Sequence, residues 1–187
     1  VPGLHNLRNA AMAVGSVLAL EGDVKEAAAS LSGFSGVDRR FDVLGTRGGV
    51  TVVDDYAHHA TEVAVTIGAA RQRFPDRRLV TVFQPHLYSR TKAQGQALGI
   101  VLSTADLIVV TDVYPAREKP IKGVTGKLVA NAVRRAGAEV EWVEHLSDLP
   151  EILSQMVRDG DVVLTLGAGD VTQVGPALLE RLAGAAA

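Results

Sequence analysis

Apolar residues along the chain follow two patterns that alternate, namely short uninterrupted runs and a recurrence at helical spacing. Runs rich in Val, Ile and Leu are typical of buried strands, and apolar residues at every third or fourth position are typical of helices. The patterns predict strands at residues 78–83, 106–111, 140–143 and 161–167, and helices at 63–74, 89–102, 127–136, 147–157 and up to about 182. The stretch 40–56 additionally predicts a hairpin that turns at 47–49. Strands that alternate with helices favour an α/β, Rossmann-like fold with a mostly parallel sheet covered on both faces.

The beginning of the chain has a different pattern from the rest. Helical spacing runs from Asn6, a candidate N-cap, to about Gly22, and a second short helix is predicted over 24–31. The Gly- and Ser-rich stretch SGFSGV follows, and the periodicity changes after it. We therefore predict a helical segment with a linker over residues 1–35, and a second domain over 36–187.

Polar residues follow the predicted strands at the same end of each one. The segments concerned are DDYAHH after VTVV, QPHLYSR after LVTVF, DVYPARE after LIVVT and AGD after VVLTLG. Open α/β sheets bind ligands at the carboxyl ends of their strands, so these segments are expected to form one site. Its candidate residues are Tyr56, His58, His59, His86, Tyr88 and Arg90.

Composition and charge exclude several functional classes. A chain of 187 residues with a net charge of −2 produces no field strong enough to favour nucleic acid or an anionic membrane as a partner. The absence of cysteine excludes disulfides, thiolate zinc sites and a cysteine nucleophile. No apolar stretch is long enough to span a membrane, and no secretory signal is evident, so we expect a cytoplasmic protein. Because the chain lacks an initial Met and soon enters a helical pattern, we expect Val1 to be a cut within a longer protein.

The paired imidazoles of His58 and His59 raise the alternative of a metal site. We predict no metal, because no cysteine or carboxylate pattern at ligand spacing accompanies them and because Asp54 and Asp55 should lie on opposite faces of their strand. An exposed Asp at a strand end suits ribose hydroxyls instead. Arg90 suits a bidentate hold on a carboxylate or phosphate.

Two glycine-containing stretches do not meet the requirements of nucleotide-binding motifs. GVTGKL (123–128) lacks the earlier glycine of a Walker A loop and has Leu128 in place of Ser or Thr. TLGAGDV (165–171) is followed by Thr172, where a dinucleotide fingerprint has its third glycine. A loop that holds the phosphates of ATP is therefore not found in this chain.

Several stretches together resemble the Mur ligase family. GLHNLRNAAMA (3–13) resembles the segment that ends the ATP-binding central domain of these enzymes, and GVDRRFD (36–42) resembles the domain junction. The stretches VDDYAHHATE, VFQPHLYSRT, DVYPAREKPIKGV and LGAGDV follow in the order found in the branch that joins L-alanine to UDP-N-acetylmuramate. The resemblance spans nearly the whole chain, and the first two of these four stretches are specific to that branch.

The resemblance implies a three-domain enzyme. Residues 1–35 would be the tail of the central ATPase domain, residues 36–187 the C-terminal domain, and the UDP-sugar domain and the phosphate loop would lie upstream. In such enzymes ATP phosphorylates the carboxylate of UDP-N-acetylmuramate, Mg²⁺ neutralises phosphate charge, and the amine of L-alanine attacks the acyl phosphate. Mg²⁺ would be bound mainly by the missing central domain, so the fragment alone is expected to be inactive.

The resemblance also implies roles for individual residues. His5 and Asn6 are expected at the adenine of ATP, Asp55 at its sugar or base, and Arg40 near its phosphates. The L-alanine pocket is expected to contain Tyr56, His58, His59, His86, Tyr88 and Arg90. In that pocket Arg90 would hold the carboxylate, and His58 would orient the ammonium group or the acyl phosphate.

The chain departs from the pattern of its relatives in ways that leave selectivity open. Relatives often have a second Arg where Leu87 stands, Gly in place of Ala57 and Pro in place of Ala60. Either Arg90 holds the carboxylate alone or Arg117 helps. One alternative is a ligase that attaches murein tripeptide to the same nucleotide sugar. Another is a stand-alone Rossmann-like module that binds a small anion.

Overall fold

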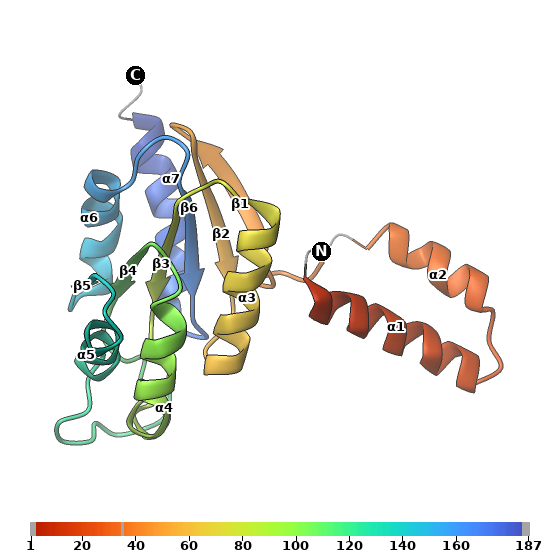
Figure 1. Cartoon of the computed structure of the whole chain (residues 1–187), viewed down its shortest axis with the longest axis horizontal. Helices are drawn as coiled ribbons and strands as arrows, with labels where there is room; N and C mark the ends of the chain where they lie inside the picture. The colour runs from red at the N-terminus through yellow and green to blue at the C-terminus, as the bar shows by residue number, and fades with distance from the viewer. Residues whose placement is uncertain (1–2, 35, 185–187) are drawn as a thin grey trace.

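A helical hairpin stands beside a sheet that is covered by helices on both faces (Figure 1). The computed structural model describes residues 3–34 and 36–184, apart from the side chain of His5. The hairpin consists of α1 (Leu4–Ala19) and α2 (Val24–Ser32). The strands are β1 (Asp42–Arg47), β2 (Val50–Asp55), β3 (Leu79–Phe83), β4 (Leu107–Val110), β5 (Val140–Trp142) and β6 (Val162–Leu166). The remaining helices are α3 (Ala60–Arg73), α4 (Tyr88–Leu102), α5 (Lys127–Arg135), η1 (Leu146–Asp148), α6 (Leu149–Met156), η2 (Asp170–Gln173) and α7 (Val174–Gly184).

The sheet has the strand order β1-β2-β6-β3-β4-β5. Strands β1 and β2 form the predicted antiparallel hairpin, and the other neighbours are parallel. The last strand, β6, lies between β2 and β3, with Asp55 and Phe83 both paired to Leu166. Phe83 is in turn paired to Val110 of β4. The ends of β2, β6, β3 and β4 therefore form one row, which we call the carboxyl edge.

Each face of the sheet has its own apolar core. Side chains that alternate along the strands point to opposite faces, and the central strands are buried throughout. One core gathers Phe83, Leu98 and Val129 with other residues of α3, α4 and α5, and the second gathers Val82, Leu153 and Leu178 with other residues of α6 and α7. The predicted α/β class, with a mostly parallel sheet covered on both faces, is thus confirmed.

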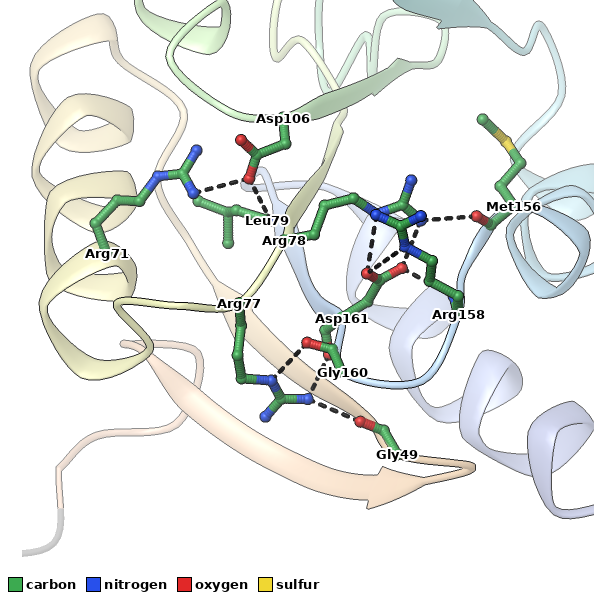
Figure 2. Close-up of polar contacts among 10 residues, drawn as sticks. All are labelled: Gly49, Arg71, Arg77, Arg78, Leu79, Asp106, Met156, Arg158, Gly160 and Asp161. Atoms are coloured by element: carbon green, nitrogen blue, oxygen red, sulfur yellow. Dashed lines mark hydrogen bonds and ion pairs between the residues drawn. The ribbon is translucent and has the colours of Figure 1, made fainter.

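The opposite edge of the sheet, which we call the amino edge, is held by arginines (Figure 2). Arg78 makes a bidentate pair with Asp161, with N–O distances of 2.9 and 2.6 Å. Arg77 donates to the carbonyls of Gly160 and Gly49, which precede β6 and β2. Asp106 accepts from Arg71 and from the N–H of Leu79. These contacts connect the starts of β2, β3, β4 and β6.

The boundaries of some helices differ from those predicted. Helix α1 begins at Leu4 rather than at Asn6, because the carbonyl of Gly3 accepts the N–H groups of Asn6 and Leu7 and closes an earlier turn. The helix predicted at 147–157 begins as the 3-10 turn η1 and ends at Met156. Within the described residues, no helix combines the length and the apolar character needed to cross a membrane.

Candidate functional site

The carboxyl edge gathers polar side chains from neighbouring loops, as the sequence predicted. Tyr56, His58 and His59 follow β2, and His86 and Arg90 follow β3. The β4–α5 loop (111–126) adds Tyr114 and Glu118. The loop of residues 167–169 after β6, which we call the glycine loop, lies between the loops that follow β2 and β3, because β6 lies between these strands. The row of aligned strand ends is therefore the reason that residues distant in sequence meet here.

Aromatic and imidazole rings form a continuous series along this edge. The ring of His58 lies 5.3 Å from that of Tyr56, edge to face, and 4.5 Å from that of His59. The His86 ring lies 5.4 Å from that of His58 and is stacked on Tyr114 with centroids 5.7 Å apart. The structure thus brings together Tyr56 and the three predicted imidazoles.

Hydrogen bonds assign the protons of the two central imidazoles. Nδ1 of His58 lies 2.9 Å from the carbonyl oxygen of Tyr56, which can only accept, so Nδ1 carries the proton and Nε2 the lone pair. Arg90 Nη1 lies 3.2 Å from Nδ1 of His86, and a guanidinium can only donate, so Nδ1 of His86 is the acceptor and its Nε2 carries the proton. One imidazole therefore offers a base and the other a donor.

Both imidazoles are held neutral near pH 7. Burial is the largest cause that lowers the pKa of His58, and the Tyr56 carbonyl and the Glu62 carboxylate oppose it. Burial also lowers the pKa of His86, the positive charge of Arg90 lowers it further, and the negative charge of Glu118 opposes the shift. A neutral His58 has the lone pair that a base needs at neutral pH.

Glu62 joins the imidazoles in a way that the sequence analysis did not anticipate. Its Oε2 accepts the backbone N–H groups of His58 and His59, and the His59 side chain accepts the N–H of Glu62, so the pair forms a capping box at the start of α3. The expectation that no carboxylate lies near the imidazoles at ligand spacing is therefore wrong, since ligand atoms of all three residues lie within 4.8 Å of one another. The same groups are used in capping the helix. That the site binds no metal stays a prediction.

The linker before β1 is attached to the carboxyl edge through Arg39. Its Nε lies 3.3 Å from Asp54 Oδ2, and its Nη2 donates to the carbonyls of Gly167 and Gly169 at 2.7 and 3.3 Å. The guanidinium also lies 4.9 Å from the centre of the Tyr56 ring, a cation–π distance. Arg39 thus fixes the linker between β2 and the glycine loop.

Arg40 also lies within cation–π distance of the Tyr56 ring. Its guanidinium lies 5.6 Å from the centre of the Tyr56 ring. Its side chain, together with Asn6 and Asp55, lines a cleft of about 870 Å³ between the helical hairpin and the sheet. Three of the four residues predicted for the nucleotide therefore border one cavity, and the side chain of the fourth, His5, lies outside the described residues.

Asp55 is buried rather than exposed at its strand end, so the expectation of an exposed aspartate is wrong. Only 6% of the residue is accessible, and its oxygens accept the N–H groups of Phe41 at 2.7 Å and Ala57 at 2.8 Å. Burial raises the pKa of the Asp55 carboxyl, and these hydrogen bonds oppose the rise. Asp55 shapes the backbone at the junction, and its contact with a nucleotide stays a prediction.

Tyr88 was predicted for the site, whereas Tyr114 and Arg39 were not. Tyr88 is the first residue of α4 and is half-buried, and within the described residues it is not among the rings in contact with His86. Tyr114 follows a predicted strand, as the other site residues do, so its place at the carboxyl edge could have been predicted. The contacts of Arg39 with the loop after β6 depend on the strand order, which the sequence does not show.

Comparisons with known proteins identify similar chains. A family model described as "Mur ligase, glutamate ligase domain" matches residues 39–169. A UDP-N-acetylmuramate–L-alanine ligase of Streptomyces avermitilis is 46% identical over 182 residues, which are 97% of this chain and 39% of that protein. A ligase of the same name from Cutibacterium acnes is 49% identical over 189 residues, which are 100% of this chain and 40% of that protein. The chain thus spans about two fifths of the length of these relatives.

Solved structures give the same picture. A UDP-N-acetylmuramate-alanine ligase from Thermotoga maritima matches with a TM-score of 0.83 and 30% identity over 99% of this chain and 39% of that one. A murein peptide ligase from Psychrobacter arcticus matches with a TM-score of 0.73 and 25% identity over 97% of this chain and 37% of that one.

Proposed function

The chain belongs to the Mur ligase family, and on that premise we propose that it is the C-terminal part of a UDP-N-acetylmuramate–L-alanine ligase. Such an enzyme forms an amide bond at the cost of ATP in the synthesis of peptidoglycan precursors in the cytoplasm. The proposal is supported by the two similar ligases and by the structural match described above. One observation carries it further, which is the row of Arg90, His86 and His58 at the carboxyl edge, beside the cleft that Arg40 lines.

This row has the chemistry that a small amino acid requires. The guanidinium of Arg90 and the Nε2–H of His86 are donors for a carboxylate. His58, neutral and with its lone pair on Nε2, is an acceptor for the ammonium end. We therefore assign the L-alanine carboxylate to Arg90 and His86, and the amine to His58.

The reaction that we propose has two steps. A carboxylate oxygen of UDP-N-acetylmuramate attacks the γ-phosphorus of ATP, ADP leaves, and an acyl phosphate forms. His58 accepts one proton of the L-alanine ammonium group at Nε2, and the freed amine nitrogen attacks the acyl carbon. The bond from the acyl carbon to the phosphate oxygen breaks, and the second proton leaves the nitrogen with inorganic phosphate. Arg90 keeps the amine oriented by holding the other end of the amino acid.

ATP is proposed to lie in the cleft between the helical hairpin and the sheet. Asn6, with the neighbouring His5, would contact the adenine, Asp55 the sugar or base, and Arg40 the phosphates. Helices α1 and α2 would be the tail of the central domain, with their exposed apolar side chains, such as Met12 and Leu18, packed against the part of that domain that lies outside this chain. Closure of the two domains would then join nucleotide and amino acid.

Mg²⁺ supplies charge neutralisation at the phosphates when it is bound. Mg²⁺ prefers oxygen ligands, whereas the described cluster of His58, His59 and Glu62 offers two imidazole nitrogens. This donor set does not fit the ion. We place Mg²⁺ mainly on the missing central domain, and no step above depends on it.

The proposal is tested by phosphate release from the intact ligase that contains this chain, with ATP, Mg²⁺ and UDP-N-acetylmuramate. L-Alanine, glycine, L-serine and murein tripeptide are offered in turn as acceptors. A preference for L-alanine is expected. A preference for the tripeptide would assign the chain to the recycling ligase instead, an alternative supported by the likeness to the murein peptide ligase.

A stand-alone binding module is the remaining alternative. It predicts no Gly-x-x-Gly-Lys-Thr-like loop in the coding sequence upstream of Val1, whereas the ligase requires one. The ligase proposal also predicts that purified residues 1–187 do not hydrolyse ATP. Hydrolysis by this chain alone would contradict it.

A further inference from the structure

Helix α4 carries Arg90 in its first turn, but the start of this helix has no cap of its own. The residue at the N-cap is Leu87, whose φ is 69°, and its side chain accepts no hydrogen bond from the helix. The first N–H groups of a helix need acceptors from outside the helix. An acceptor supplied by another segment can therefore determine where α4 begins and how its first turn is oriented.

Glu118 of the β4–α5 loop is that acceptor. Its Oε2 accepts the backbone N–H of Ser89 at 2.9 Å, and its Oε1 accepts the Ser89 hydroxyl. The two contacts from Ser89 also lower the pKa of the Glu118 carboxyl, and a negative charge is favoured at a helix N-terminus. Ser89 and Glu118 are 29 residues apart, so the fold, and not the local sequence, brings this cap to α4.

The loop that carries Glu118 is itself anchored at both ends. Asp112 Oδ1 accepts the N–H of Gly126 at 2.8 Å and closes the loop on itself. Tyr114 donates its N–H to the carbonyl of Pro85 at 2.8 Å and accepts the N–H of Leu87 at 2.9 Å. The loop therefore holds the segment before α4 by its backbone and the start of α4 by the carboxylate.

The turn before Glu118 directs the side chain back to the helix. The N–H of Glu118 donates to the carbonyl of Pro115 at 2.9 Å. Ala116, within this turn, has a φ of 50°, a conformation that residues other than glycine rarely adopt. A backbone held in such a conformation requires support from its surroundings. The hydrogen bonds of Glu118 to α4 are part of that support.

We propose that Glu118 is a positioning residue for Arg90. By capping α4 from the β4–α5 loop, it fixes the turn from which Arg90 reaches His86 and the carboxylate of the incoming amino acid. The part of this statement that concerns the amino acid rests on the proposed function, and the part that concerns α4 does not. Since Glu118 orients a binding group and transfers no proton, its loss should weaken amino-acid binding more than it slows the chemical step.

The first arm of the test measures the cap itself in the 187-residue chain. Amide hydrogen exchange at Tyr88 and Ser89 is compared between wild type, Glu118→Ala and Glu118→Gln, with Glu139→Ala, an exposed glutamate before β5, as the matched control. Glu118→Ala is expected to exchange roughly tenfold faster, as for the loss of a helix cap. Glu118→Gln keeps an acceptor oxygen and is expected to be intermediate. Unchanged exchange in Glu118→Ala would overturn the proposal.

The second arm measures the kinetics of the intact ligase with the same variants. Glu118→Ala is expected to raise the KM for L-alanine roughly tenfold while kcat stays within about twofold, with partial rescue by Glu118→Gln. Faster exchange with an unchanged KM would overturn the positioning role. A wild-type enzyme that does not use L-alanine would reject the proposed function, and the exchange arm would still decide whether Glu118 fixes α4.

Discussion

Two arginines at opposite edges of one sheet, Arg78 and Arg90, use their charge in opposite ways. At the amino edge, Asp161 is 1% accessible and accepts two bonds from Arg78 and one from the N–H of Arg158. At the carboxyl edge, Arg90 is matched with the neutral imidazole of His86, and within the described residues no carboxylate lies within 4 Å of its guanidinium. The first arrangement connects strands, whereas the second leaves a charge for a ligand to match. The same residue type therefore stabilises the fold when its partner lies within the chain, and can bind a ligand when it does not.

The largest effect is expected at the amino edge, from Asp161→Ala. The change removes the carboxylate that pairs with Arg78 and the acceptor of the Arg158 N–H. Because the Arg78 side chain is 26% exposed, water can solvate part of the unpaired charge. We expect the free energy of unfolding to fall by about 2–4 kcal/mol. Urea unfolding of the chain measures it, with Asp161→Asn as the milder variant.

The matched control for this prediction is Asp76→Asn, an exposed aspartate of the turn before β3. Its effect is expected to stay within about 0.5 kcal/mol. Equal effects of the changes at Asp161 and Asp76 would show that the arginine cluster does not hold the edge.

A smaller effect is expected from Gly169→Ala at the carboxyl edge. A Cβ at this position would lie 2.5 Å from Cγ of Tyr114 and would also meet Gln84 Oε1. Overpacking of this kind costs about 1–3 kcal/mol, and here it would displace the ring stacked on His86. Urea unfolding and the activity of the intact ligase are both measured, and activity is expected to fall more than the stability change alone explains.

Gly68→Ala is the control for added volume, since a Cβ there meets nothing within 4 Å. In the middle of α3 it should raise stability by about 0.5–1 kcal/mol. If Gly169→Ala behaved in the same way, the close packing of Tyr114 on the glycine loop would be refuted.

The smallest effect concerns pH and separates the two edges. The pKa values of His58 and His86 lie below their ordinary value of 6.5, so the unfolded chain binds these protons more tightly. The free energy of unfolding should therefore fall as the pH drops below 6.5 and level off below the lowered pKa values. The hydrogen bond from Arg71 holds the pKa of Asp106, at the amino edge, below its ordinary 3.8. The contribution of Asp106 to the free energy of unfolding is therefore lost only as the pH falls below about 3.8.

Urea midpoints measured between pH 8 and pH 5 check this sign. The double variant of His58→Gln and His86→Gln should lose part of the wild-type slope, whereas His145→Gln should keep it. Burial of Asp55 raises its pKa and acts in the opposite direction, so the variants are compared with wild type rather than judged by absolute slope. An identical slope in the double variant would mean that the two imidazoles are not held neutral by the fold.

The elements of the fold could be predicted from the sequence, but their order in the sheet could not. Runs such as those of β3 and β6 are buried throughout, and the helices between them have clear periodicity, so local pattern defines each one. The insertion of β6 between β2 and β3 depends on packing between segments far apart in the chain. Local pattern contains no information on that order.

The site residues that directly follow a strand could be predicted, because the ends of the strands could be predicted. Tyr56, His58 and His86 follow predicted strands, and the structure brings them into one series of rings. Glu62 and Glu118 were missed because each acts as a hydrogen-bond acceptor for backbone N–H groups. Glu62 has the spacing of a capping box, but His59 stands where Ser or Thr is usual, so the signal is weak. For Glu118 the role depends on a loop that returns to another helix.

We expect Asp161 at the amino edge to stabilise the chain and Arg90 at the carboxyl edge to bind the amino acid. Measuring both the unfolding free energy and the KM for L-alanine in Arg90→Ala and in Asp161→Asn, in the intact ligase, separates these two roles. Arg90→Ala is expected to raise KM by about ten- to a hundredfold, the equivalent of about 1.5–3 kcal/mol, with little loss of stability, and Asp161→Asn is expected to do the reverse. An unchanged KM for L-alanine in Arg90→Ala would show that Arg90 does not bind the amino acid, and a destabilisation as large as that of Asp161→Asn would show that Arg90 is a structural residue.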